Sequence, residues 1–271
     1  MHYSSIIQLL RKHPLTKDVA KWVKSKSQTL QINGLQASGK SMMMCAIWQT
    51  SKSKILYVAE DAETAAYFYN DINRAIPANQ CGLLPSSYKK SPKHGAIDLA
   101  SEIMRTDALN TINKTRDTNQ DANWLIVTSP EGLIERVAPQ QTLQSHRITI
   151  RKSEDIDSEQ LIQTLNEWGF ELVEFVYEPG QYAQRGSIID IFSFSNERPY
   201  RIDLWGDTVE SIRIFDIEKQ LSINEIESVD ILPNISAKDN KESISIFNFL
   251  PSDTIICWAD FTHTINRINQ I

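Results

Sequence analysis

Residues 54–75, KILYVAEDAETAAYFYNDINRA, join an apolar strand to an amphipathic helix. The apolar residues of the helical part recur at the spacing of one helix face; they are Ala65, Phe68, Tyr69 and Ile72. A second continuous apolar strand, residues 124–128, follows another helical pattern at 96–114. Continuous apolar strands that alternate with helices are typical of a parallel sheet covered on both faces. We therefore predict that residues 1–145 form an α/β domain.

The pattern changes after residue 146. We expect a helix over 157–168, with Gly169 in the position where a glycine often ends a helix. The strands that we expect next are 171–178, 186–194, 200–205 and 208–216, the last two joined by a Gly206-Asp207 hairpin turn. This predicts an inserted α+β domain with an antiparallel sheet at 146–233. Residues 234–243 resemble a polar linker, and 254–259 resemble a further strand of the first domain, so 234–271 forms a third segment.

Charge supports the same division. Residues 1–145 carry 17 basic and 12 acidic side chains, whereas residues 146–233 carry 8 basic and 18 acidic ones. Phosphate binding needs clustered basic residues, so the acidic segment is more naturally a protein-docking module than a nucleic-acid platform. The basic first domain leaves DNA binding open as a weaker alternative. No apolar run approaches the ~18–20 residues of a membrane-spanning helix.

Residues with catalytic or metal-binding chemistry do not cluster in the sequence. The three cysteines, Cys45, Cys81 and Cys257, are far apart and have no metal-ligand spacing. The five histidines are isolated from one another, and no nucleophile–base arrangement can be proposed. We therefore expect no catalytic residue and no metal site in this chain, and the cysteine usage favours a reducing cytoplasm.

Residues 34–41, GLQASGKS, match the phosphate-binding loop pattern G-x-x-x-x-G-K-S. We expect a strand at 28–33 before this loop and a helix at 42–50 after it, which makes the first domain P-loop-like. In such a loop, backbone N–H groups converge on a phosphate. The candidate nucleotide-binding residues are Gly34, Gly39, Lys40 and Ser41.

ATP hydrolysis would need further groups. Glu60-Asp61, at the end of the strand 55–59, could supply a carboxylate for Mg²⁺, but no D-E-x-x motif and no placed arginine finger accompany it. The alternative is a retained loop shape that binds no nucleotide.

Residues 200–205, YRIDLW, alternate apolar and polar side chains. Tyr200, Ile202 and Leu204 are expected in the core, with Leu204 opposite Val209 across the turn. Arg201 and Trp205 would share the more exposed face, beside Arg185 at the start of the adjacent strand; arginine and tryptophan are typical of interface hot spots. In the alternative interpretation, Trp205 packs under the helix 157–168, and the arginines pair with local acids such as Asp203 and Glu210.

Three stretches in the second domain resemble a known family. They are 177–192 (YEPGQYAQRGSIIDIF), 199–207 (PYRIDLWGD) and 209–216 (VESIRIFD). They resemble the N-terminal, UvrB-homologous region of the bacterial transcription-repair coupling factors (Mfd), as do 84–90 and Arg105-Thr106. UvrB itself has a long aromatic hairpin after its third strand, for which residues 88–97 leave no room.

The resemblance implies a function for each segment. Residues 1–145 would be UvrB-like domain 1a, a degenerate helicase-like fold; 146–233 would be the UvrA-binding domain 2; and 234–271 would be the start of domain 1b. Arg185, Arg201 and Trp205 would dock UvrA. This surface would be masked by a C-terminal domain in the intact protein until the motor engages DNA.

The resemblance also implies a cytoplasmic repair role for the chain. It would recruit UvrA to stalled RNA polymerase in transcription-coupled nucleotide excision repair, without enzymatic activity of its own. The full-length family protein is an ATP-dependent DNA translocase that binds RNA polymerase and double-stranded DNA through its other domains. Relatives usually have a degraded phosphate loop. This chain retains the pattern, so an ATP-binding or ATPase domain acting through Lys40 and Ser41, with ATP and Mg²⁺ as ligands, is the rival hypothesis.

Overall fold

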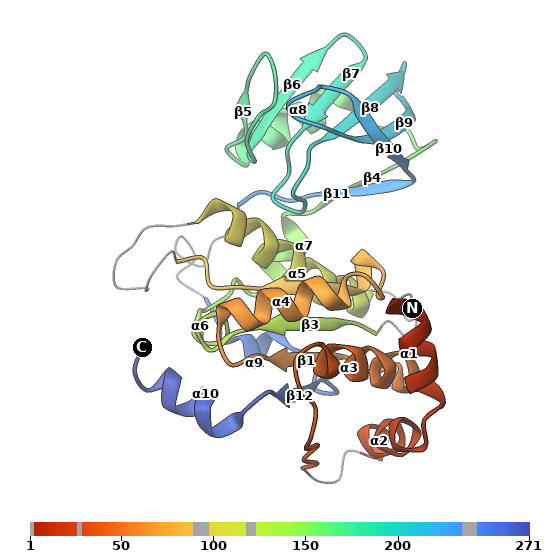
Figure 1. Ribbon diagram of the computed structural model, residues 1–271. Coiled ribbons are helices and arrows are strands. Elements are labelled where there is room, and N and C mark those ends of the chain that lie inside the picture. Colours follow the sequence, from red (N-terminus) through yellow and green to blue (C-terminus); the bar gives the residue numbers. More distant parts are fainter. Residues whose placement is uncertain (1–2, 26–28, 89–97, 118–122, 235–242) are drawn as a thin grey trace. The chain divides into compact units, whose positions relative to one another are not determined.

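The computed structural model describes residues 3–25, 29–88, 98–117, 123–234 and 243–271. These residues form two compact units, which are considered separately (Figure 1). The first unit comprises Met1–Ser101, Ala108–Val137 and Ile244–Ile271. The second unit comprises Glu102–Asp107 and Ala138–Ser243. The division therefore falls at 101/102, 107/108, 137/138 and 243/244, and our domain limits at 145/146 and 233/234 stay predictions.

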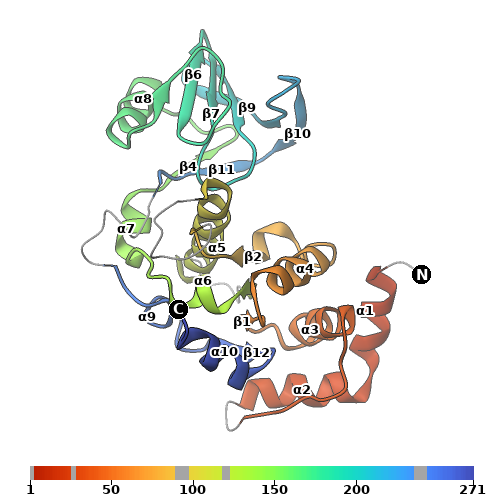
Figure 2. The same ribbon diagram turned by 60° about the vertical axis from the view of Figure 1, so that its left-hand side comes forward.

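A four-stranded parallel sheet forms the centre of the first unit (Figure 2). Its strands, in spatial order, are β12 (Ile255–Trp258), β1 (Ile55–Val58), β3 (Leu125–Thr128) and β2 (Cys81–Leu84). Ile55 lies opposite Leu125 on one side and Ile255 on the other. All residues of β1, β2 and β3 are buried, as the continuous apolar sequences predicted. The predicted parallel sheet is confirmed.

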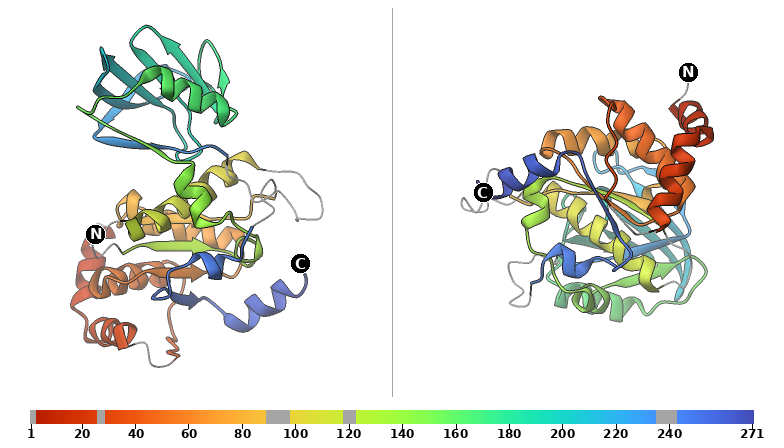
Figure 3. Two further views of the ribbon diagram at one scale, coloured as in Figure 1. Left: turned by 180° about the vertical axis from the view of Figure 1, so that it is seen from behind. Right: turned by 90° about the horizontal axis from the view of Figure 1, so that it is seen from below.

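Helices precede and follow each of these strands (Figure 3). They are α1 (Tyr3–Lys12), α2 (Pro14–Ser25), α3 (Ser38–Ser51), α4 (Ala62–Ile72), α5 (Leu99–Asp117), α6 (Pro130–Ile134), α9 (Ile246–Phe249) and α10 (Phe261–Ile268), with a short 3₁₀ helix at Ala78–Gln80. Asp61 caps α4, because its carboxylate accepts a 2.7 Å hydrogen bond from the Thr64 N–H. Phe68 of α4 stacks on Tyr57 of β1, with the ring centroids 3.9 Å apart. The predicted inner face of this helix therefore packs on the sheet.

The strand that we expected at 28–33 is wrong for residues 29–33, which form no strand and are exposed. Its two apolar side chains, Leu30 and Ile32, remain 41% and 37% exposed. Both sides of β1 are already occupied, by β12 and β3, so this segment has no place beside the central strand. The chain thus reaches the glycine-rich loop without the strand that a phosphate-binding loop normally follows.

A six-stranded sheet dominates the second unit. Its spatial order is β10 (Ser222–Ile226), β9 (Thr208–Phe215), β8 (Tyr200–Trp205), β7 (Ile188–Ile191), β6 (Gln181–Arg185) and β5 (Glu171–Leu172). All neighbours are antiparallel except β5 and β6, so the expected antiparallel sheet is confirmed. A separate antiparallel pair joins β4 (Ile148–Arg151) and β11 (Ser228–Ile231). Helices α7 (Gln140–Ser145) and α8 (Ser158–Glu167), together with residues Glu102–Asp107 of α5, complete the unit.

Two strand predictions for this unit need correction, and three of its strands were not predicted. The strand expected at 171–178 ends after Leu172, and a strand that we did not predict follows at Gln181–Arg185. The strand expected at 186–194 begins only at Ile188, because Gly186 takes a positive φ of 61° in the turn that separates β6 from β7. Strands β10 and β11 were not predicted. The predicted linker lies mostly at 235–242, outside the described residues.

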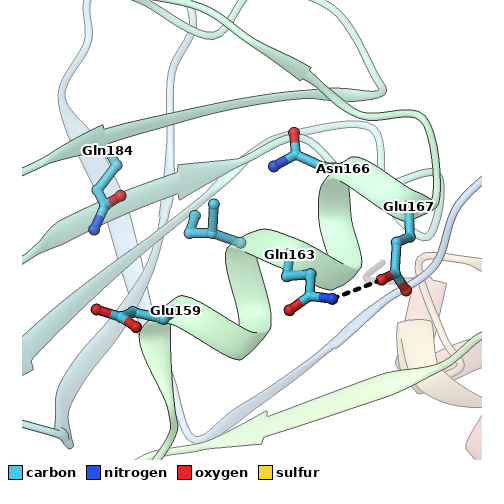
Figure 4. A pocket seen from close by; sticks show the side chains of 6 residues that line it. Glu159, Gln163, Asn166, Glu167 and Gln184 are labelled. Carbon is cyan, nitrogen blue, oxygen red and sulfur yellow. Dashed lines mark hydrogen bonds between the residues drawn. The ribbon is translucent and has the colours of Figure 1, made fainter.

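The core of the second unit lies between one face of the six-stranded sheet and α8. Tyr200, Ile202 and Leu204 are buried there, together with Leu161 and Leu165 of the helix. Gly169 ends α8 with φ of 79°, as expected. A hollow of about 410 Å³ borders α8 and Gln184 of β6, and Figure 4 shows its polar rim, including the 2.9 Å hydrogen bond from Gln163 to Glu167. Gln184 precedes Arg185 on β6, so Arg185 points to the opposite face of the sheet.

Candidate functional site

The opposite face of the six-stranded sheet carries a row of charged side chains. Register places Asp190 of β7, Arg201 of β8 and Arg213 of β9 directly beside one another, and the uncharged Ala183 of β6 lies on the other side of Asp190. Successive side chains of a strand point to opposite faces. Asp190 therefore points away from the core that its neighbours Ile189 and Ile191 fill. We call Arg185, Asp190, Arg201 and Trp205 the arginine face.

The carboxylate of Asp190 binds both arginines of this face. Arg201 donates from Nε to Oδ1 at 2.7 Å and from Nη2 to Oδ2 at 2.9 Å. Arg185 donates from Nη2 to the same Oδ2. The side chain of Asp190 is 1% exposed, whereas those of Arg201 and Arg185 are 18% and 36% exposed. One buried acid thus orients two partly exposed guanidinium groups.

Aromatic rings and backbone carbonyls hold the guanidinium groups from other sides. The Arg201 guanidinium lies 4.7 Å from the centroid of Phe215, and that of Arg185 lies 5.2 Å from the centroid of Phe175. Both distances are within the range of a cation–π contact. Arg185 also donates from Nη1 to the carbonyl of Glu174 at 2.7 Å. The hydrogen bond to Asp190 raises the pKa of Arg201 further above its ordinary value, so this side chain stays cationic.

Trp205 is 80% exposed at the end of β8. Alternation places it on the same face as Arg201, four residues further along, or about 13 Å at ~3.3 Å per residue. Between them, Asp203 accepts a 3.2 Å hydrogen bond from Arg213. Gly206 forms the turn after Trp205 with φ of 62°. A large indole is thus presented to solvent at a hairpin.

The alternative interpretation of this strand is wrong for Trp205, but its expectation that the arginines pair with a local acid is confirmed. Trp205 does not pack under α8, because it is exposed. The arginines of the face bind Asp190 rather than Asp203 or Glu210, and Arg213 is the partner of Asp203. Leu204 does lie opposite Val209, as predicted. Arg185 ends β6 instead of opening the next strand.

Sequence reasoning missed Asp190 and Arg213. Asp190 could have been found, because it is a lone acid within the apolar strand IIDI. A carboxylate in such a strand must be ion-paired if it is buried. Nothing in the spacing of Arg213 distinguishes it from a solvated arginine.

The segment that matches the phosphate-loop pattern uses its own donors internally. The N–H of Gly39 donates to the Gln36 carbonyl at 2.9 Å, and the N–H of Lys40 donates to the Ala37 carbonyl at 3.1 Å. Gly34 has a positive φ of 87°, so it supplies a turn there. Two backbone donors that would face a phosphate are therefore occupied by loop carbonyls.

The side chains of this segment are also engaged. Lys40 Nζ lies 3.1 Å from Glu60 Oε1, the carboxylate that we considered for Mg²⁺. The buried hydroxyl of Ser41 lies 2.7 Å from Asp71 Oδ2 and 2.9 Å from the Ser38 carbonyl, and it accepts a 3.4 Å hydrogen bond from Tyr3. Burial raises the pKa of Tyr3 to about 12, so its hydroxyl remains a donor.

Two further properties of the described residues bear on the function. No helix within them is long and apolar enough to cross a membrane. Their histidine, cysteine and acidic side chains form no group of three or more that could hold a metal ion.

Comparison with known proteins gives a consistent result. The family model for the UvrB interaction domain matches residues 148–236. The transcription-repair-coupling factor of Escherichia coli is 29% identical over 251 residues, which are 92% of this chain and 21% of that protein. The chain is a relative of the transcription-repair-coupling factors. That of Bacillus subtilis is 31% identical over 201 residues, 74% of this chain and 16% of that protein. That of Haemophilus influenzae is 33% identical over 138 residues, 51% of this chain and 11% of that protein.

The resemblance that we recognised in the sequence is therefore confirmed. The chain spans about a fifth or less of the length of these transcription-repair-coupling factors. The UvrB interaction domain match includes the whole six-stranded sheet, and with it all four residues of the arginine face. The comparisons thus relate the second unit, in particular, to an interaction domain.

Proposed function

We propose that the second unit docks UvrA through Arg185, Arg201 and Trp205. The observation that carries this proposal is the arginine face itself: two guanidinium groups on one buried carboxylate, on the same face as an indole that is 80% exposed. A guanidinium has five N–H donors in a fixed fork, so donors remain for a partner carboxylate after Asp190 is bound. An exposed indole is the usual apolar anchor of such an interface.

In this proposal the chain is a recruiting module without catalysis of its own. It brings UvrA to RNA polymerase stalled at DNA damage, so that nucleotide excision repair is coupled to transcription. The ATP-dependent translocase, and the binding of RNA polymerase and double-stranded DNA, belong to the rest of the full-length protein. The relation to the transcription-repair-coupling factors supports this role. We place the protein in the cytoplasm on the same grounds.

The test is titration calorimetry of purified UvrA against this chain and two double variants. Arg185→Ala/Arg201→Ala removes both guanidinium groups of the arginine face. Arg151→Ala/Arg198→Ala removes the same charge from exposed positions outside the six-stranded sheet. We expect binding by the wild type and by the second variant only. Equal binding by all three proteins, with native circular dichroism, would refute this assignment.

ATP binding through Lys40 and Ser41 gains no support from the geometry of its loop. The N–H groups of Gly39 and Lys40 and the side chains of Lys40 and Ser41 already have partners within the first unit. A phosphate would have to displace Glu60 from Lys40 and break the contacts of Ser41. Recruitment of UvrA is therefore the function that the structure favours.

A further inference from the structure

Asp190 is the most buried charged group of the second unit's sheet. It lies on β7, between β6 and β8, and its side chain is 1% exposed. A carboxylate in such a place is unfavourable unless it is paired and its oxygens accept hydrogen bonds. Arg201 binds both of its oxygens and Arg185 binds one of them. Asp190 thus depends on the same two arginines that would face a partner.

The dependence also runs in the other direction. An arginine side chain with four rotatable bonds loses much freedom when a partner binds it, unless it is already held in place. Arg201 is held by Asp190 and by the ring of Phe215, and Arg185 by Asp190, Phe175 and the carbonyl of Glu174. Asp190 is the element that the two arrangements share. It therefore fixes the two guanidinium groups relative to each other.

The charges at this point do not cancel. Asp190 contributes one negative charge and the two arginines contribute two positive charges, so one positive charge remains. The neighbouring pair of Asp203 and Arg213 is neutral. The arginine face therefore presents ordered donors with a single excess positive charge, which suits an acidic side chain of a partner.

We propose that Asp190 is the positioning residue of the arginine face, which presets Arg185 and Arg201 for a carboxylate of the partner. This inference rests on the proposed docking of UvrA. It assigns to Asp190 a role in binding although its carboxylate is too deeply buried to touch the partner.

Removal of the charge of Asp190 separates two effects of opposite sign. If only the excess positive charge mattered, Asp190→Asn would strengthen binding of an acidic partner, because a negative charge has gone. If the preset geometry matters, the same variant weakens binding, because the two guanidinium groups repel each other and an asparagine side chain offers them one acceptor oxygen in place of two. The matched control is Asp203→Asn, which removes the same charge from the same face but leaves Asp190 in place.

The experiment measures the affinity of UvrA for the wild type, Asp190→Asn and Asp203→Asn by calorimetry at 15 °C, with the folded fraction of each taken from circular dichroism. We expect a loss of about tenfold or more for Asp190→Asn. We expect at most about a twofold change for Asp203→Asn. The loss should be smaller when Asp190→Asn is introduced into Arg201→Ala, because the part of the effect of Asp190 that acts through Arg201 is then absent and only the part that acts through Arg185 remains.

Each result has a distinct meaning. Affinity equal to or higher than that of the wild type for folded Asp190→Asn would overturn the inference, as would an undiminished loss in the Arg201→Ala background. Should Asp190→Asn be unfolded at 15 °C, Asp190→Glu takes its place: it keeps the charge but moves the carboxylate by one methylene, and unchanged affinity would again overturn the inference. No binding by the wild type would refute the proposed function itself, and the inference with it.

Discussion

Replacement of Arg201 by alanine should destabilise the second unit even when no partner is present. Arg201 supplies one of the two hydrogen bonds to Oδ2 of Asp190, and within the described residues it is the only donor to Oδ1. After Arg201→Ala, Arg185 still binds Oδ2, but Oδ1 loses its guanidinium donor inside a site that is 1% exposed. A buried acceptor without a partner is what makes the variant unfavourable.

The expected magnitude follows from these contacts. Loss of one partner from a buried ion pair costs about 3–5 kcal/mol when the remaining charge is wholly uncompensated. Here Arg185 retains part of the compensation, and the space left by the side chain admits water to Oδ1. We therefore expect a decrease of about 2 kcal/mol in the free energy of unfolding, near the value for one hydrogen bond to a charged group.

Urea denaturation followed by circular dichroism measures this decrease, with Arg213→Ala as the matched control. The side chain of Arg213 is 37% exposed and binds Asp203, whose side chain is 23% exposed, so its removal should cost less than about 1 kcal/mol. The reasoning would be refuted by equal losses in the two variants, or by a loss below about 0.5 kcal/mol for Arg201→Ala.

Three further outcomes are expected. Trp205→Ala should change the free energy of unfolding by no more than about 0.5 kcal/mol, because the indole is exposed, but it should weaken the binding of UvrA by about 2 kcal/mol, or roughly 30-fold. Urea titration of this variant measures the first effect and calorimetry measures the second, and unaltered affinity would remove Trp205 from the interface. Millimolar ATP with Mg²⁺ should not shift the melting temperature of the wild type or of Lys40→Ala, because the loop donors are occupied; a rise in the wild type alone would restore the rival hypothesis. Burial raises the pKa of the Cys45 thiol from 9.0 to about 12. The unfolded chain therefore loses this proton at a lower pH than the folded chain does. The stability that the protonated thiol contributes is complete below pH 9 and is lost as the pH rises towards 12. Urea titrations at pH 8 and pH 10 should show this decrease, and Cys45→Ala should reduce it; a decrease of the same size in Cys45→Ala would exclude this thiol as a cause.

The sequence predicts the two sheets, and which side chains of one strand of the site are buried. It does so because alternating apolar and polar residues, and continuous apolar runs, follow directly from burial. Strand Tyr200–Trp205 is the clearest case: Tyr200, Ile202 and Leu204 are buried, and Trp205 is exposed, as predicted. The glycine-rich segment is the clearest failure. Its pattern contains the residues of a phosphate loop, but the pattern does not reveal that Leu30 and Ile32 find no neighbouring strand or that Glu60 binds Lys40.

Asp190 illustrates a different limit. Its partners, Arg185 and Arg201, lie 5 and 11 residues away in sequence, and they meet it only because β6, β7 and β8 adopt one particular register. A shift of one residue would turn the carboxylate to the other face. The identity of a buried ion pair therefore depends on register, which local sequence patterns specify poorly.

The pairing of β1 with β12 has a consequence for the order of events during synthesis. Ile55 lies opposite Ile255, so about 200 residues separate two adjacent strands. At about 5–20 residues per second, a ribosome needs roughly 10–40 s to make them. During that interval, one edge of β1 lacks its neighbour, and by its end the whole second unit has been translated. The second unit can therefore fold before the first has a complete sheet, and chaperones that mask strand edges would protect the first unit rather than the second.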